Sequence, residues 1–171
     1  MNSILANILL LVQERINTEV TAIKWIDQDL GQLEFYTMGQ PPVLFPAALI
    51  DFPDTQYSDL AENQQLGESV LEVRLAVAAY TPSAHVHSQQ QKEKALEYYN
   101  VEHEVNKALH GWCDSRYFSP LSRTGGQTER REDNIRVRTL RYKFALQDNT
   151  AMAVAAVTVP RPALELDYQT K

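Results

Sequence analysis

Two apolar stretches and the polar stretch between them are the clearest pattern in this chain. Residues 44–52 (LFPAALIDF) are almost wholly apolar, residues 53–68 are polar and acidic, and residues 69–81 (SVLEVRLAVAAYT) are apolar again. The first run is short and bounded by prolines, which predicts a strand buried on both faces. The second run begins with the alternation of a strand that has one solvated face. The acidic segment is therefore predicted to be a long loop that projects from a sheet.

Helical spacing predicts two helices. Ser3 is a suitable N-cap for a first helix with apolar residues along one face. Leu10 and Leu11 widen that face, which predicts burial on two sides or a contact with another subunit. A second helix is predicted to start at Ser88, where Gln91 completes a capping box. Its predicted buried stripe is Tyr98, Val101, Val105, Leu109 and Trp112.

Shorter patterns predict the remaining strands. Residues 20–26 are rich in β-branched side chains, and residues 33–37 alternate between apolar and polar. Residues 135–146 and 151–159 are expected to form a hairpin that turns at an Asp-Asn pair, because such a pair tolerates positive φ.

The order of these elements predicts an α+β fold with one mostly antiparallel, twisted sheet packed against two helices. Residues 1–159 are expected to form a single domain with the long acidic loop projecting from it. Residues 113–134, which contain two adjacent glycines and many polar side chains, are expected to be a loop. Pro160 and Pro162 cannot continue a strand ladder, so residues 160–171 are expected to form an extended C-terminal arm.

The charge of the chain is unevenly distributed. The net charge of −6 argues against non-specific binding of nucleic acid by the whole surface. Residues 123–143 nevertheless carry a net charge of +4, because they hold seven basic and three acidic side chains. Arg136 and Arg138 fall on the same predicted face as Leu140. Either a bulge near Thr139 rotates this strand, or its first half leaves the subunit core and meets another surface.

The candidate catalytic and metal-binding patterns are all incomplete. His85 and His87 lack a third and fourth ligand at a suitable spacing. His103 precedes a glutamate, as in a zinc-protease helix, but the second histidine is replaced by Lys107. Cys113 is the single cysteine, which excludes an internal disulfide and favours a reducing compartment. We therefore predict no cofactor, no metal site and no enzymatic activity.

The first helix does not predict a membrane segment. Its apolar run, residues 4–12, is too short to span a bilayer and lacks the basic start and the cleavage site of a signal peptide. We therefore expect an intracellular protein without a membrane partner.

The arrangement of these segments resembles the phage tail terminator, or tail completion, family. The similarity lies in an N-terminal helix, an apolar strand that begins with Phe-Pro at residues 45–46, and a polar loop. The similarity also includes a long strand that ends in Tyr-Thr at residues 80–81, followed by a long helix. A closing hairpin, entered through Asp-Asn at residues 133–134, completes the similarity. It covers most of residues 1–159 and is a similarity of order and spacing.

The resemblance implies a non-enzymatic virion protein, assembled in the cytoplasm of a bacterial host. It would form a ring, typically of six subunits, on the head-proximal end of the tail tube, or a related cap on a phage-like contractile particle. Such a ring ends tube polymerisation and contacts the tail tube protein and the head connector protein, with possible passage of DNA through its lumen. The alternatives are a head–tail connector or neck protein, and a small cytoplasmic enzyme or ligand-binding domain with a pocket formed by Tyr98, Tyr99 and Trp112.

A ring of identical subunits needs two different surfaces that fit one another. The candidates are the widened first helix, the acidic segment, the basic segment and the C-terminal arm. The arginines of the basic segment are expected to face either DNA or the acidic segment of a neighbouring subunit. The predicted interface residues are Leu10, Leu11, Asp54, Asp59, Glu62, Arg130, Arg131, Arg136, Arg138 and Arg161.

Overall fold

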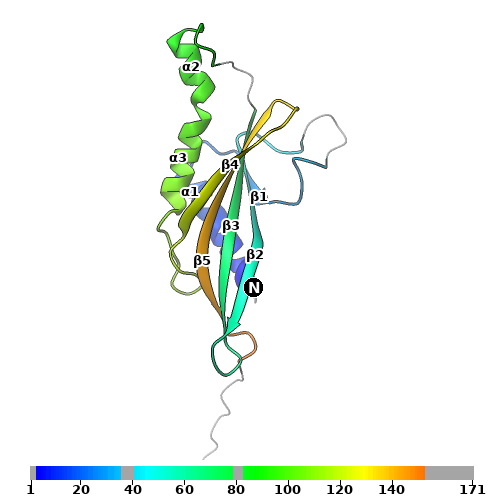
Figure 1. The fold of residues 1–171 in the computed structure, drawn as a ribbon, viewed down its shortest axis with the longest axis vertical. Helices are drawn as coiled ribbons and strands as arrows, with labels where there is room; N and C mark the ends of the chain where they lie inside the picture. The colour runs from blue at the N-terminus through cyan, green and yellow to red at the C-terminus, as the bar shows by residue number, and fades with distance from the viewer. Residues whose placement is uncertain (1–2, 36–40, 79–82, 153–171) are drawn as a thin grey trace, which may run out of the picture.

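The computed structural model describes residues 3–35, 41–78 and 83–152, which form an α+β fold with one five-stranded sheet (Figure 1). The strand order is β1-β2-β3-β5-β4; β1 runs parallel to β2 and all other neighbours are antiparallel. The mostly antiparallel sheet of the prediction is confirmed. The strands are β1 (Trp25–Gln28), β2 (Ala47–Asp59), β3 (Gln65–Ala78), β4 (Ser122–Glu129) and β5 (Ile135–Asp148). The helices are α1 (Ile4–Glu19), α2 (Gln89–Leu96) and α3 (Tyr98–Leu109).

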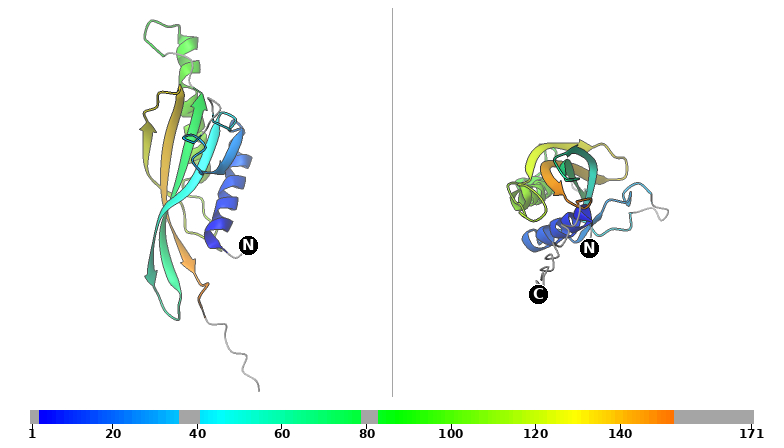
Figure 2. Two further views of the ribbon diagram at one scale, coloured as in Figure 1. Left: turned by 90° about the vertical axis from the view of Figure 1, so that its right-hand side faces the viewer. Right: turned by 90° about the horizontal axis from the view of Figure 1, so that it is seen from below.

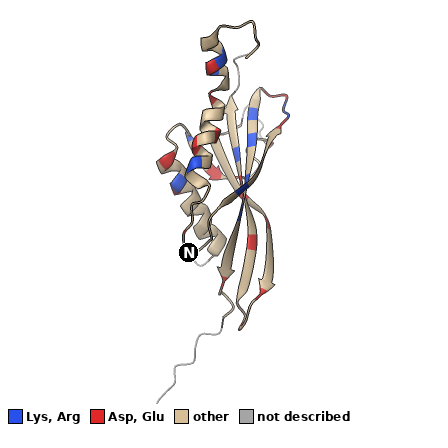
Figure 3. Ribbon diagram, turned by 60° about the vertical axis from the view of Figure 1, so that its left-hand side comes forward, with Lys and Arg blue, Asp and Glu red and all other residues tan. Residues whose placement is uncertain are grey.

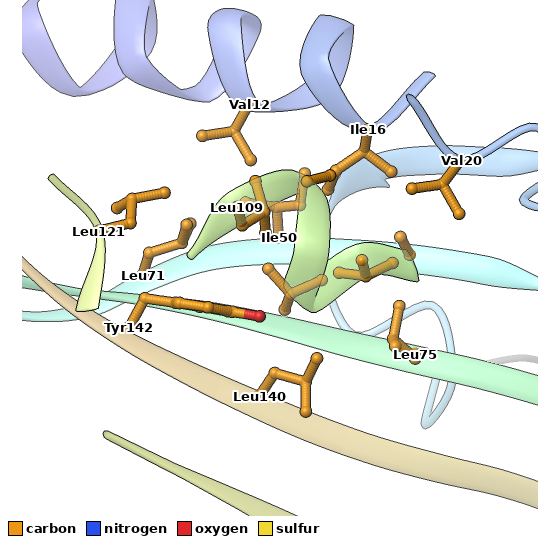
Figure 4. Packing of buried hydrophobic residues seen from close by; sticks show 14 of the residues in the cluster. Val12, Ile16, Val20, Ile50, Leu71, Leu75, Leu109, Leu121, Leu140 and Tyr142 are labelled. Carbon is orange, nitrogen blue, oxygen red and sulfur yellow. The ribbon is translucent and has the colours of Figure 1, made fainter. Parts of the chain in front are cut away.

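Helices α1 and α3 pack together on one face of the sheet and form the main core with it (Figures 2 and 4). α1 begins as predicted, because the hydroxyl of Ser3 accepts a hydrogen bond from the amide of Ala6 at 3.4 Å. Burying each large apolar side chain contributes on the order of 1.5–3 kcal/mol, so this layer stabilises the fold most. Its fully buried members include Val12, Ile16, Ile50, Leu71, Leu109, Leu140 and Tyr142.

A smaller core lies on the opposite face of the sheet, where the chain between β1 and β2 covers it. Leu33 from this connection packs against Leu49 of β2 and Val137 of β5, and all three are fully buried. Because successive residues of a strand point to opposite faces, residues 47–50 of β2 contribute to both cores. The prediction of a strand buried on both faces is confirmed for residues 47–50, whereas residues 44–46 of the predicted strand precede β2 and Leu44 is 60% exposed.

The acidic segment 53–68 is a β-ribbon and not the predicted loop. β2 continues to Asp59 and β3 starts at Gln65, so only residues 60–64 connect the two strands. The sequence favours a loop here because proline and aspartate disfavour strands. In the structure β3 is paired with β2 on one side and β5 on the other along this whole length, and this pairing outweighs the local preference. The ribbon extends away from the helices (Figure 1).

Gly67 lets the side chains of this ribbon pack closely. A Cβ atom at Gly67 would lie 2.9 Å from Leu146 Cδ1 and 3.0 Å from Tyr57 Cε1, both closer than van der Waals contact. The hydroxyls of Thr55 and Ser69 are also hydrogen-bonded to each other across the strands, at 2.7 Å. These contacts stiffen a ribbon that two strands alone would not stabilise.

The C-terminal half departs from the prediction in two places. Residues 122–129 were expected to be loop but form β4, which pairs with β5, so the hairpin seen is β4–β5. The expected partner strand, residues 151–159, begins with a turn in which the amide of Met152 donates to the carbonyl of Asn149. Residues 153–159 and the predicted arm 160–171 lie outside the described part of the chain.

Three other predicted elements are placed differently. The first predicted short strand is only residues 25–28, and residues 31–35 form a turn where a strand was expected. The capping box of Ser88 and Gln91 is confirmed. The single predicted second helix is divided at Glu97 into α2 and α3, and α2 has no buried residue and lies beyond the end of the sheet (Figure 1).

Candidate interaction surfaces

The charged first half of β5 lies beneath α3. The register between β3 and β5 is unbroken from Asp148 to Ile135, so no bulge rotates the strand against β3. Arg136 lies over the ring of Tyr98 at 4.2 Å from the ring centroid, and Arg138 Nε donates to Glu102 Oε2 at 2.9 Å. Neither of the two predicted explanations is therefore correct, because this half-strand has no bulge against β3, stays within the subunit and meets the subunit's own helix α3.

Glu102 is the centre of this ion cluster. It is 8% exposed, and each of its carboxylate oxygens accepts a hydrogen bond from a different guanidinium, Arg123 or Arg138. Arg138 also donates to the hydroxyl of Thr128 at 3.0 Å. Because a buried carboxylate needs such partners to offset desolvation, these two arginines have a structural role within the subunit.

Tyr98 and Tyr99 complete this end of α3. Their rings lie 4.2 Å apart, and Arg136 lies near both rings. Burial, together with the hydrogen bond to Tyr99, raises the pKa of Tyr98 to about 12, and the positive charge of Arg136 opposes this only in part. Through Arg136 of β5, the stack places the start of α3 against the sheet.

A second ion cluster lies on the opposite face of the sheet, around Arg74 of β3. Its guanidinium donates to Asp29 at 2.7 Å, to Glu34 at 2.6 Å and to Glu129 at 2.8 Å. Burial alone would lower the pKa of Arg74, but the three carboxylates outweigh it and raise that pKa. Burial likewise opposes ionisation of Glu129, yet its hydrogen bonds to Arg74 and Thr139 hold its pKa below the ordinary value. Arg74 thus fixes the connection after β1 to both β3 and β4.

Arg131 extends this cluster, whereas its neighbour Arg130 is exposed. Arg131 pairs with Asp133 at 2.6 Å and with Glu34 at 3.1 Å, and it donates to the carbonyl of Leu33. Hydrogen bonding to Asp133 is the largest influence on the pKa of Arg131 and raises it. Of these two neighbouring arginines, both of which were among the predicted interface residues, only Arg130 is exposed.

The Arg74 cluster was not predicted from the sequence. Its members are up to about a hundred positions apart in the chain, and helical or strand periodicity does not connect them. An arginine in the apolar half of a predicted strand was the one available signal.

The connection between β1 and β2 also carries exposed apolar side chains. They are Leu30, Phe35 and Leu44, which are 70%, 85% and 60% exposed.

The acidic ribbon is the most distinct charged surface. Asp54, Asp59 and Glu62 are exposed, and with Glu68 and with Asp51, which precedes the ribbon, they make five acidic residues in residues 51–68, a stretch without lysine or arginine. Within the described ranges none of these five carboxylates forms an ion pair, while those of the two clusters all do. Figure 3 marks acidic positions in red along the strands of the ribbon. The ribbon therefore carries most of the chain's net negative charge of −6.

Helix α1 contributes a third surface. Leu10 is 51% exposed, while Leu11 is partly buried against the main core. Leu10 lies at the edge of a groove of about 440 Å³ between α1 and the chain around β1, with Ile23 and Ile26 on its other side. Arg161, the last predicted interface residue, lies outside the described residues.

The alternative chemical sites find no geometric support. Tyr98 is the first residue of α3 and Trp112 follows its end, so the two are roughly 20 Å apart along the axis and the predicted shared pocket is wrong. Cys113 and His103 are exposed, and His110 Nδ1 accepts a hydrogen bond from the amide of Arg123. In the part of the chain that the structure describes, no group of three or more His, Cys, Asp or Glu side chains is arranged to hold a metal ion. No described helix combines the length and the apolarity that crossing a membrane requires.

Comparison with known proteins gives a likeness in structure alone. No protein-family model and no curated protein matches the chain. Among solved structures the chain is similar to one described as "Virion of native gene transfer agent (GTA) particle". The similarity covers 80% of this chain and 92% of that chain, with 13% sequence identity and a TM-score of 0.42. At this identity and score, the likeness concerns overall architecture and assigns no function to the residues described above.

Proposed function

We propose that this chain is a structural virion protein that forms a ring on the head-proximal end of the tail tube of a phage or a phage-like particle. In that position the ring would end polymerisation of the tube and join it to the head. Part of the order of elements that underlies the resemblance to tail terminators is present in the fold. An N-terminal helix, an apolar strand, a long antiparallel strand and a helical segment follow one another, whereas the expected polar loop is a ribbon and the hairpin is β4–β5.

The observation that carries this proposal is the acidic β2–β3 ribbon. It projects from the body, it is stiffened by the contacts around Gly67, and its four carboxylates have no ion pair among the described residues. A rigid charged projection can dock on a partner without a large loss of conformational entropy. We assign this ribbon to contact with the tail tube protein.

The two ion clusters refine the role of the basic segment. Arg123, Arg131 and Arg138 already pair with carboxylates of the same subunit. Their charges are therefore largely neutralised before any partner approaches. We propose that the exposed residue Arg130, rather than the whole basic segment, is available to a neighbouring subunit or to DNA.

The mass of the purified protein in solution tests the ring. Light scattering should be measured over a concentration and salt series, with and without polymerised tail tube. A closed assembly near six subunits, or a monomer that forms one only on the tube, supports the proposal. A protein that stays monomeric or dimeric and does not bind the tube contradicts it.

A tube-length assay tests the capping function separately. Tube protein should polymerise with increasing amounts of this chain, and the tubes should be measured by electron microscopy. Capping predicts that tubes become shorter and carry a ring at one end. Tubes of unchanged length with no terminal ring would instead favour a connector or neck protein that binds after the tube is complete.

A further inference from the structure

The outer edge of the acidic ribbon has space for another strand. β1 pairs with β2 only as far as Ile50, and β2 continues to Asp59. Along residues 53–59 no strand from the described part of the chain occupies the side of β2 that faces away from β3. We call residues 53–59 the open edge. Its unpaired backbone groups are a template for strand addition.

The ribbon holds this edge in an extended conformation. β2 and β3 keep a regular register from Asp54 to Asp59, after the irregularity between Asp51 and Asp54. Tyr57 is 46% exposed although it packs beside Gly67, so its ring has one free side. A partner strand with small side chains would fit against that ring.

The chain itself contains a segment with the properties that this edge needs. Residues 153–159 read AVAAVTV, a run of alanines and β-branched residues followed by Pro160 and Pro162. The composition favours a strand, and the prolines end its pairing. The run is seven residues long, which is close to the length of the open edge between the irregularity at Asp51/Asp54 and the 60–64 turn.

The open edge of a second copy is a better partner for this segment than the open edge of the same chain. Met152 Sδ lies 2.9 Å from Gln64 Nε2, which places the start of the segment where β3 begins. To reach the outer side of β2, the same chain must cross two strand spacings, roughly 10 Å, which takes about three extended residues. Only about four of the seven residues would then remain to pair. A second copy can align all seven.

We infer that residues 153–159 of one copy add as a strand to the open edge of the next copy. This contact joins two different surfaces, so it propagates around a ring, and it therefore rests on the proposed ring function. Arg161 lies two residues beyond the segment and would reach one end of the open edge in either strand direction. Both ends are acidic, with Asp51 and Asp54 at one and Asp59 and Glu62 at the other.

Disulfide trapping tests the contact directly. In a Cys113→Ser background, one chain carries Gln56→Cys on the open edge, and a second chain carries Ala155→Cys, Ala156→Cys or Val157→Cys. Facing residues of adjacent strands have Cα atoms about 4.5–5.5 Å apart, which suits a disulfide. Mixing the two chains under oxidation should give a disulfide-linked dimer for at least one of the three cysteine positions 155, 156 and 157. The matched control is Gln127→Cys on the other edge strand, β4, which should give at least tenfold less product.

The chain that carries both cysteines identifies the donor. A ladder of linked copies supports exchange between subunits, whereas a linked monomer would show that the segment pairs within its own chain and would overturn the inference. Preferred linkage to Gln127→Cys, or no linkage at Gln56→Cys in a protein that forms rings, would also overturn it.

A proline substitution separates this inference from the proposed function. Val157→Pro removes a backbone donor from the middle of the segment, while Thr170→Pro near the C-terminus is the matched control. We expect Val157→Pro to weaken ring assembly at least tenfold and Thr170→Pro to leave it unchanged. Rings that form normally with Val157→Pro would refute strand exchange and leave the ring proposal intact. If the wild-type protein forms no rings and the cysteine variants give no linked copies, with or without the tube, both are refuted.

Discussion

Arg138 of β5 and Glu102 of α3 are joined by a 2.9 Å hydrogen bond between Nε and Oε2. The pair lies under the helix, where Arg123 binds the other oxygen of the same carboxylate. It explains why a strand face can change from charged to apolar without a bulge. The helix supplies a counter-charge over the first half of the strand and apolar side chains over the second.

Replacing Glu102 with glutamine should destabilise the protein. The change leaves two guanidinium groups facing a neutral amide, and because the arginines are partly exposed we expect a loss of about 2–3 kcal/mol in the free energy of unfolding. Chemical denaturation monitored by circular dichroism measures it. Glu104→Gln is the control, since its ion pair with Lys107 is long and exposed, and it should change stability by less than about 0.5 kcal/mol. Equal effects of the two substitutions would contradict the role assigned to Glu102.

The Arg74 cluster predicts a loss of stability in acid. The pKa of Glu129 is held below its ordinary value of 4.5 in the folded protein. Its contribution to stability is therefore complete above that value and is lost as the pH falls through the lower folded pKa. Thermal unfolding between pH 7 and pH 3 should show this decline in the wild type.

Arg74→Leu should reduce stability at pH 7 and flatten the decline in acid. Without the guanidinium, the carboxylates of Asp29, Glu34 and Glu129 repel one another, and their protonation then relieves the repulsion. We expect a loss of about 3 kcal/mol at neutral pH. A pH profile parallel to that of the wild type would show that the lowered pKa of Glu129 does not depend on Arg74.

Gly67→Ala should destabilise the ribbon selectively. The added Cβ would meet Leu146 and Tyr57 at 3.0 Å or less, which we expect to cost about 1–3 kcal/mol. Hydrogen exchange should then increase in residues 54–68 more than in the main core. Gly125→Ala is the matched control, because nothing lies within 4 Å of a Cβ at that position. Protection that falls equally in both variants would argue against close packing at Gly67.

Neutralising the ribbon should weaken docking without unfolding the protein. In the triple variant Asp54→Asn, Asp59→Asn and Glu62→Gln, every substituted side chain is exposed, so stability should change by less than about 0.5 kcal/mol. We expect at least a tenfold loss of tube binding in a pull-down at low salt. The matched control neutralises Glu14, Glu93 and Glu132, which are also exposed. If both triple variants bind equally well, the docking surface lies elsewhere.

The structure also changes an expectation about the basic strand. From the sequence, reversing the charge of Arg136 and Arg138 should impair assembly and leave the monomer folded. Arg138→Glu would instead place a carboxylate beside Glu102, and the monomer should be destabilised. Arg130→Glu, at an exposed position, is the variant that tests assembly alone. It should change the mass in light scattering but leave the melting temperature within about 2 °C of the wild type.

The sequence by itself determined the elements that depend on close neighbours. Ser3 caps α1 through an amide three residues away, and Ser88 forms its capping box with Gln91. The strand over residues 69–78 and the buried strand that begins β2 follow from apolar patterns of a few residues. These signals require no knowledge of the rest of the chain.

Only the tertiary structure decided the features that join distant parts of the chain. The acidic segment became a ribbon because β5 pairs with β3 along its full length, and residues 122–129 became β4 because β5 offered its other edge. Arg74 is bound by carboxylates 45, 40 and 55 positions away. Backbone pairing and burial of charge depend on which segments meet in space, and a local pattern of polar and apolar residues does not contain that information.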